Sequence, residues 1–329
     1  MAGLTQERAA ELLDGLSKIR ALVIGDLMID RYISGTVERV SPEAPVPVVR
    51  VEEERAAIGG AGNVAANVAA LGAGCDIVGC VGDDEAGEAM KAELVALGVA
   101  VDGVVTAADR PTTVKTRVTA RHQQIVRFDH ESERDVDDET SGRLGSAISA
   151  LAGSCDVLIM EDYNKGVLVP GVIGTALTEA ESKGIPSVVD PKRRNFFEFG
   201  GVTVFKPNAK ELADALGAFI HPDDPEWMEA TRSRLGCANL VLTLGDRGLA
   251  LQGEDQGHLR VPAVAQSVYD VSGAGDTVTA VVASIMAAGG TAAEAAIIAN
   301  HAAAVEVSKT GVATVSPAEI LRHFAIEAA

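Results

Sequence analysis

The sequence predicts one α/β domain over residues 1–329, with a mainly parallel sheet, helices on both faces and a small β-lid. Apolar runs of strand length alternate repeatedly with helical patterns, which indicates parallel strands joined by right-handed crossovers. Two segments interrupt this alternation: 31–54, which is rich in proline, and 112–130, which has the period of a β-hairpin. We expect these two segments to pair as the lid, outside the main sheet.

The elements of the main sheet follow from runs of apolar residues that end in turns or polar clusters. The expected strands are 21–26, 75–81, 156–160, 187–190, 202–205, 240–244 and 257–268. The expected helices are 5–16, 84–97, 169–182, 208–216, 225–235, 274–288, 292–307 and 317–325, and one more that opens at 59–63 and ends at 71. Because polar residues follow several strands, we expect the ligand site beyond the carboxyl ends of the strands.

Composition limits the possible partners. The formal net charge of −19 repels nucleic acid and anionic membranes, so we expect a small-molecule ligand instead. The four cysteines form no CxxC pair and the six histidines have no zinc-site spacing, so we expect reduced, buried thiols and no zinc. The charged start of the chain and the absence of a long apolar run predict neither a signal peptide nor a membrane span, and a cytoplasmic location.

One stretch carries the strongest chemical signal: Asp270-Val-Ser-Gly273-Ala274-Gly275-Asp276-Thr277. Small residues at the start of a helix leave backbone N–H groups uncovered, and the helix dipole favours an anion there. A carboxylate beside a bound phosphate suits a general base that takes a proton from an attacking hydroxyl. The alternative is an ordinary helix start, with Asp276 as a favourable acid in the first turn.

This stretch and two others together resemble the ribokinase-like (PfkB-type) carbohydrate kinases. The other two are Gly59-Gly60-Ala-Gly-Asn63-Val-Ala65 and Asn208-Ala-Lys-Glu211, the second preceded by Lys206-Pro207. The resemblance extends from about residue 25 to 315. It implies a ribokinase-like fold and an ATP-dependent sugar kinase that uses Mg²⁺, and it admits a monovalent cation as a further cofactor.

Further stretches resemble the D-glycero-β-D-manno-heptose-7-phosphate kinases. They are 39–48, 123–129, 162–166 and Asp190-Pro191-Lys192. This resemblance implies phosphorylation of the anomeric O1 hydroxyl to the 1,7-bisphosphate, in ADP-heptose synthesis for lipopolysaccharide core. The chain shows no nucleotidyltransferase signature after the kinase part, so we expect a separate protein to supply that step. It departs from the heptose kinases where Arg193-Arg194 replaces a usual glycine.

The resemblance assigns site residues by role. Asp276 is the expected base, and Gly273, Ala274 and Gly275 supply backbone N–H groups to the transferring phosphoryl group. The residues expected to bind the sugar or its phosphate are Asp30, Gly59, Gly60, Asn63, Asp162, Lys192, Arg193 and Arg121. As alternatives, Asp30 is a turn acid, the two glycines form a loop before a helix, and 192–194 is a solvated basic run.

The nucleotide site is expected from a second group of residues: Asn208, Glu211, Thr243, Gly245, Gly248, Asn300 and Gly311. Asn208 and Glu211 also suit Mg²⁺ held through water, since this ion prefers few protein oxygens. The alternative is a helix capping box formed by the same two residues. Asn300 alone is equally compatible with a polar position on a helix.

Three other functions are weighed against the heptose kinase. The first is another sugar or sugar-phosphate kinase of the same family. The second is an NAD-dependent oxidoreductase, although the first βα turn, Gly25-Asp-Leu-Met, lacks Gly-x-Gly-x-x-Gly. The third is a non-catalytic sugar-phosphate sensor, which the intact Asp276 argues against. The exposed lid strands also predict a homodimer, because strand edges readily pair between subunits.

Overall fold

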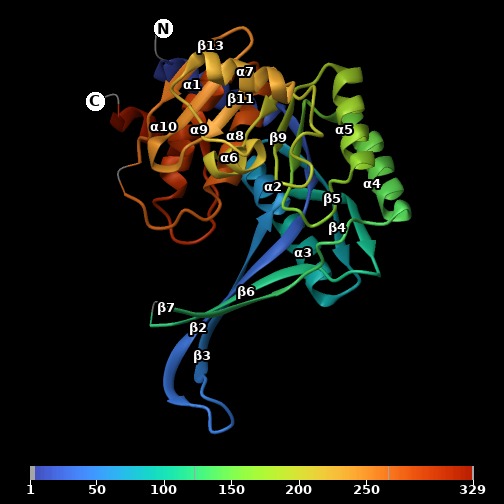
Figure 1. Ribbon diagram of the computed structural model, residues 1–329, viewed down its shortest axis with the longest axis vertical. Coiled ribbons are helices and arrows are strands. Elements are labelled where there is room, and N and C mark those ends of the chain that lie inside the picture. The colour runs from blue at the N-terminus through green and yellow to red at the C-terminus, as the bar shows by residue number, and fades with distance from the viewer. Residues whose placement is uncertain (1–3, 122, 266, 328–329) are drawn as a thin grey trace.

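The computed structural model describes residues 4–121, 123–265 and 267–327 (Figure 1). Its main sheet has nine strands in the order β13-β12-β11-β10-β9-β8-β1-β4-β5. Pairs from β5 to β11 are parallel, and β12 and β13 add an antiparallel edge. The strands are β1 (Arg20–Gly25), β4 (Gly74–Gly82), β5 (Val99–Ala107), β8 (Val157–Glu161), β9 (Ser187–Asp190), β10 (Val204–Phe205), β11 (Asn239–Thr243), β12 (Leu249–Gly253) and β13 (Gly257–Val261).

Helices cover both faces of this sheet, as the alternation predicted. They are α1 (Gln6–Gly15), α2 (Ala61–Ala70), α3 (Glu85–Ala96), α4 (Asp138–Leu151), α5 (Pro170–Lys183), α6 (Ala209–Leu216), α7 (Pro225–Leu235), α8 (Ala274–Ala287), α9 (Ala292–Glu306) and α10 (Pro317–Glu327). Two apolar cores result: one holds side chains of α1, α2, α3, α8, α9 and α10, and the other those of α4, α5, α6 and α7.

Strand β1 shows why the sheet has two cores. Its side chains are almost all apolar and point alternately to opposite faces, so Val23 enters the first core while Leu22 and Ile24 enter the second. A strand buried on both sides reads as a continuous apolar run, which explains why the sequence located it.

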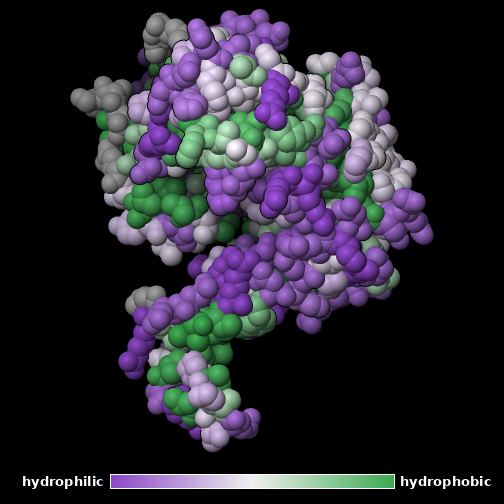
Figure 2. Space-filling model, viewed as in Figure 1, coloured by the Kyte–Doolittle hydropathy of each residue, from purple (hydrophilic) through white to green (hydrophobic). Residues whose placement is uncertain are grey.

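The two predicted lid segments pair in a second sheet, which projects from the body of the molecule (Figure 1). Its strands are β2 (Leu27–Val40), β3 (Pro47–Gly60), β6 (Thr113–Ala120) and β7 (Gln123–His130), in the order β3-β2-β6-β7. The long β2 and β3 reach back to the main sheet, and Gly60 both ends β3 and is the N-cap residue of α2, the helix that was expected to open at 59–63. Figure 2 shows apolar residues gathered on the projecting part of the lid.

The structure differs from the sequence prediction in three elements that were missed and one that is shorter. Strands β5 and β12 and helix α4 were not expected, because each mixes polar residues or glycine into its apolar pattern. The strand expected at 257–268 ends at Val261, before Pro262, since proline has no N–H to donate to a ladder. Within that range, Gln266 lies outside the described residues.

The cysteines are buried and unbridged, as expected. Cys75, Cys80, Cys155 and Cys237 are free thiols, all buried. Among the described helices, none has the length and apolar character that crossing a membrane requires.

Candidate active site

A cavity of about 270 Å³ lies where the lid meets the N-terminus of α8. Its lining combines residues of the lid, of α2 and of the Asp270–Thr277 stretch: Met28, Asp30, Tyr32, Gly59, Gly60, Asn63, Lys115, Arg117, Arg127, Tyr163, Ser272, Gly273, Asp276 and Val312. The structure thus brings Asp276 and Gly273 together with four of the residues expected to bind the sugar, although these lie far from them in the sequence. The four are Asp30, Gly59, Gly60 and Asn63.

Asp276 lies at this cavity with both carboxylate oxygens held. Asn63 Nδ2 donates to Oδ2 over 2.7 Å, and the Tyr163 hydroxyl donates to Oδ1 over 2.8 Å. Burial raises the pKa of Asp276 to about 6, against the lowering effect of these two hydrogen bonds. A carboxylate with that pKa is ionised at neutral pH and still basic enough to accept a proton, as general base catalysis requires.

Helix α8 begins inside the Asp270–Thr277 stretch. Gly273 is its N-cap residue, with φ of 96°, and no side chain caps the helix. A Cβ at this position would stand 3.0 Å from Asn63 Nδ2, so the chain needs glycine here for both conformation and space. The Ala274 N–H makes only a long contact of 3.4 Å with Val271 O, and no side chain caps the other N–H groups of the first turn, so this turn can offer donors to a phosphoryl group.

Asp26 holds the loop that carries Tyr163. Its buried carboxylate accepts hydrogen bonds from the backbone N–H groups of Tyr163 (2.8 Å), Lys165 (2.9 Å) and Val167 (3.1 Å). Neither Tyr163 nor this role of Asp26 was predicted. The available signal was that both side chains follow buried strands at the carboxyl edge of the sheet.

Three lid cations face the cavity, and the sequence analysis assigned none of them to the site. Lys115 and Arg117 are two residues apart in β6, so they lie on the same face of the lid. Arg117 is paired with Asp30, and Arg127 is paired with Asp129 at 2.7 Å. Among the described residues, no carboxylate forms an ion pair with Lys115, whose ammonium group instead lies 3.0 Å from Met28 Sδ. Burial lowers the pKa of Lys115, which a bound anion would reverse.

The cations that the sequence favoured for the substrate phosphate do not line the cavity, although the Lys192 ammonium group lies 5.0 Å from the centre of the Tyr163 ring, which does. Lys192 pairs with Asp190 at 3.1 Å and with Glu211 at 2.7 Å, outside the residues that line the cavity. Arg193 is exposed, and Arg121 is an exposed residue with φ of 49° in the turn between β6 and β7. Asp162 is buried and accepts a hydrogen bond from Asn164 N, and burial raises its pKa to about 6.

Three carboxylates cluster at the ends of β8 and β9: those of Glu161, Asp190 and Asp276, each with an oxygen within 4.8 Å of the others. Asp190 accepts from Lys206 over 2.7 Å and from Lys192 over 3.1 Å, so both its oxygens already bind ammonium groups. Neither oxygen of the buried Glu161 has a hydrogen-bond partner among the described residues. Burial, together with the nearby carboxylates of Asp190 and Asp276, raises the pKa of Glu161 well above its ordinary value.

The residues expected at the nucleotide lie around the ends of β11 and α9. Asn208 is bridged to Thr243, which ends β11, and Gly245 and Gly248 turn the chain after it with φ of 62° and 83°. Asn300 Nδ2 donates to Pro262 O over 2.8 Å, and the Gly311 N–H donates to Asp270 over 3.2 Å.

Asn208 and Glu211 form the capping box that was the alternative reading of this pair. Each side chain accepts a hydrogen bond from the other's backbone N–H over 2.8 Å. The second oxygen of Glu211 pairs with Lys192. This donor set fits Mg²⁺ only through water, since Lys192 already offsets the charge of the carboxylate.

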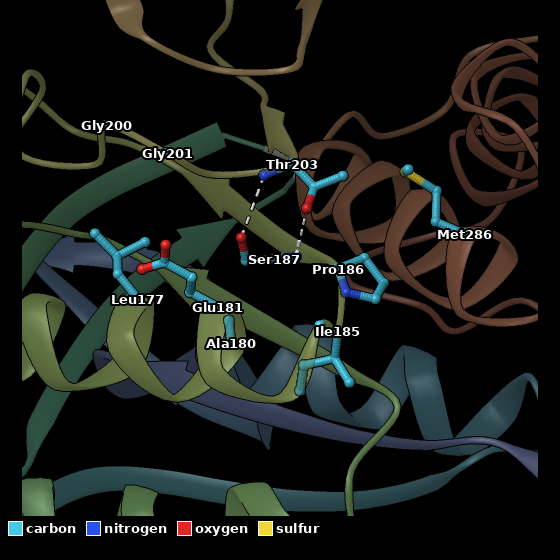
Figure 3. Close-up of a pocket in the computed structure, with 11 residues that line it drawn as sticks. Leu177, Ala180, Glu181, Ile185, Pro186, Ser187, Gly200, Gly201, Thr203 and Met286 are labelled. Carbon is cyan, nitrogen blue, oxygen red and sulfur yellow. Dashed lines mark hydrogen bonds between the residues drawn. The ribbon is translucent and has the colours of Figure 1, made fainter.

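A second cavity of about 590 Å³ lies at the opposite ends of the strands (Figure 3). It is bordered by α5, by the segment Gly184–Ser187 that leads into β9, and by Met286 near the end of α8. Ser187 and Thr203 exchange two hydrogen bonds there, and Glu181 is the one ionisable residue among those that line it. This cavity lacks the grouped acids and cations of the first.

Solved structures of sugar kinases share the fold. Ribokinase from Arabidopsis thaliana, in complex with ribose and ATP, matches with a TM-score of 0.72 and 19% identity, over 93% of this chain and 98% of that one. Phosphofructokinase-2 from Escherichia coli, in complex with potassium, matches with a TM-score of 0.78 and 18% identity, over 94% and 99%. The fold is ribokinase-like, as the sequence predicted.

Residues 18–319 match the model of the pfkB family of carbohydrate kinases, and the chain belongs to that family. Among curated proteins, the bifunctional protein HldE of Pelobacter propionicus is 45% identical over 308 residues, and that of Azorhizobium caulinodans is 45% identical over 305. These alignments cover 93% and 91% of this chain and 63% of each relative. Family membership removes the oxidoreductase alternative.

Proposed function

We propose that the protein transfers the γ-phosphoryl group of ATP to the anomeric O1 hydroxyl of D-glycero-β-D-manno-heptose 7-phosphate. The product is the 1,7-bisphosphate, an intermediate of ADP-heptose synthesis for lipopolysaccharide core. One observation carries the proposal: the buried Asp276 lies beside the uncapped N-terminus of α8, in a cavity that also holds an unpaired lid lysine. The similarity to HldE proteins supports the choice of sugar.

The proposed reaction needs one proton transfer and one phosphoryl transfer. Asp276 takes the proton of the O1 hydroxyl while the oxygen bonds to the γ-phosphorus and the bond to the ADP oxygen breaks. Asn63 and Tyr163 orient the carboxylate, and the N–H groups of Gly273, Ala274 and Gly275 stabilise the charge on the transferring group. Asn208 and Glu211 would hold Mg²⁺ through water, and the bound ion would neutralise charge on the phosphates of ATP.

The phosphate of the substrate is assigned to the lid. Lys115 is the described lid cation of the cavity that has no carboxylate partner, and Arg117 and Arg127 lie beside it. A buried ammonium group of this kind gains a charge-assisted hydrogen bond when a phosphate binds. We prefer these lid cations to Lys192, Arg193 and Arg121 in that role, because Lys192 already pairs with Asp190 and Glu211 and none of the three lines the cavity.

ADP release over a panel of sugars tests the proposal. We expect the highest kcat/KM with the heptose 7-phosphate, and we expect Lys115→Met to raise the KM for that sugar about 10-fold to 100-fold. The same variant should leave the KM for the unphosphorylated heptose nearly unchanged. Lys183→Met, which removes an exposed lysine at the end of α5 that pairs with Glu179 at 2.6 Å, is the matched control.

The alternative is another sugar kinase of the same family. Turnover of ribose or fructose 6-phosphate without turnover of the heptose 7-phosphate would select this alternative. A panel without any turnover, in a protein that still binds the sugar phosphate, would favour the non-catalytic sensor.

The proposal includes a homodimer formed through the lid and a cytoplasmic location. The lid exposes apolar side chains, with exposed fractions of 64% for Val40, 55% for Val51 and 55% for Phe128 (Figure 2). Pairing of two lids would bury this surface, and Phe128→Asp should then shift the mass measured by light scattering from dimer to monomer. The buried reduced thiols and the need for ATP suit the cytoplasm.

A further inference from the structure

Glu306 is a buried acid directly behind the anion site, and the proposed reaction gives it no role. It is the last residue of α9 and is 0% exposed. Neither carboxylate oxygen makes a well-formed hydrogen bond among the described residues, and the one donor that faces the group, the Ala313 N–H, lowers its pKa less than burial raises it. Its Oε1 lies 3.3 Å from the point where a Cβ on Gly273 would stand, so it packs against the residue that caps α8.

The surroundings of Glu306 offer it little positive charge. Asp270 and Asp276 face it from the stretch before and inside α8. The nearest lysine in the chain, Lys309, is already engaged: its ammonium group donates to Thr314 O over 2.7 Å and pairs with Glu319 at 2.7 Å. The carbonyl end of α9 adds a partial negative charge at the same place.

Arg55 is a further cation near the Asp270–Thr277 stretch, and it lies against Gly311, whose N–H donates to Asp270. Its Nη1 is 2.9 Å from where a Cβ on Gly311 would stand, and its guanidinium lies over the ring of Tyr32 at 4.4 Å. An ionised Glu306 would therefore place an unpaired negative charge behind the N–H groups that must bind a phosphoryl anion.

We propose that Glu306 is a neutral carboxylic acid beneath the anion site, and that phosphoryl transfer requires it to be neutral. It is a positioning residue, which acts through Gly273 on the N–H groups of α8. When Glu306 loses its proton, its negative charge repels the phosphoryl anion that these N–H groups bind. The expected effect on the reaction rate rests on the proposed kinase activity, whereas the expected effect on stability does not.

Burial, with Asp270 and Asp276, raises the pKa of Glu306 to about 8. The neutral fraction then falls about tenfold between pH 7 and pH 9. Because kcat/KM reports the pKa values of the free enzyme, the wild type should lose about tenfold in kcat/KM over this range. The loss occurs as pH rises, since the active form is the protonated one.

The test compares the wild type with Glu306→Gln, a neutral side chain of the same shape. We expect the variant to keep kcat/KM at pH 7 within about twofold and to lack the alkaline loss. Glu294→Gln, the same change at the other end of α9, should keep that loss. The proposal is overturned if Glu306→Gln still loses kcat/KM at alkaline pH. It is also overturned if the variant is inactive at pH 7, because the enzyme would then need an ionised carboxylate paired with a cation at this position.

Thermal unfolding gives a second measurement that does not depend on activity. An acid whose pKa is raised in the folded state makes the protein less stable as pH rises from the ordinary glutamate value toward 8. The Tm of Glu306→Gln should therefore exceed that of the wild type by a margin that grows over this range. A margin independent of pH, or a variant that does not fold, contradicts the neutral acid even if no sugar is turned over.

Discussion

Replacing Tyr163 with phenylalanine tests how the site sets the basicity of Asp276. The change removes one hydroxyl, which donates to Asp276 Oδ1 over 2.8 Å and lowers the pKa of the carboxylate. A hydrogen bond to a charged group contributes about 1.5–3 kcal/mol, and one pKa unit corresponds to about 1.4 kcal/mol. The pKa of Asp276 should therefore rise by about 1 to 2 units from its value of about 6.

In Tyr163→Phe, the acid limb of the profile of kcat/KM against pH should therefore move to higher pH. Asp276 must be ionised to act as a base, so activity falls as pH drops through its pKa. At pH 6.5 the ionised fraction should fall about threefold for a shift of one unit and about 25-fold for two units. At pH 9 the two proteins should differ little in this fraction.

The assay measures ADP release and gives kcat/KM for the sugar from about pH 5 to about pH 9, which covers both the acid and the alkaline limb of the pH profile. The substrate phosphate titrates in the same range for both proteins, so the difference between the profiles isolates Asp276. Tyr32→Phe removes a hydroxyl from the same cavity without touching Asp276 and should leave the limb in place. An unchanged limb in Tyr163→Phe, or an equal loss at every pH, would refute the reasoning.

Three further predictions concern the base, the anion site and the metal. Asp276→Asn should lower kcat by at least about 10³-fold while calorimetry still detects sugar binding; near-normal turnover would remove the assignment of the base. Gly273→Ala should lower the free energy of unfolding by about 1–2 kcal/mol and also lower kcat, because the new Cβ meets Asn63. Gly72→Ala is the control: its φ is 89° and no atom lies near its new Cβ, so it should lower stability and leave kcat unchanged. Glu211→Gln keeps the cap, so the Tm should change little while the Mg²⁺ concentration for half-maximal rate rises several-fold; an unchanged Mg²⁺ titration would contradict the metal role.

The sequence was most informative where local periodicity and motif coincide. The apolar runs predicted β1 and β8, and the glycines of Asp270–Thr277 predicted an anion site with an acid beside it. Strand β5 and helix α4 were missed because their half-buried faces carry polar residues, so their periodicity is weak. Their place is fixed by contacts with neighbouring elements, which no local pattern records.

What the sequence by itself determined is the alternation of strands and helices, the lid segments and the place of Asp276 in the first turn of a helix behind small residues, because each is encoded in consecutive residues. What only the tertiary structure decided is which charges are free. Lys192 and Lys115 look alike in the sequence, yet Asp190 and Glu211 neutralise the first while the second faces the cavity without a described carboxylate partner. The physical reason is that the availability of a charge depends on distances of a few ångströms between residues that are far apart in the chain.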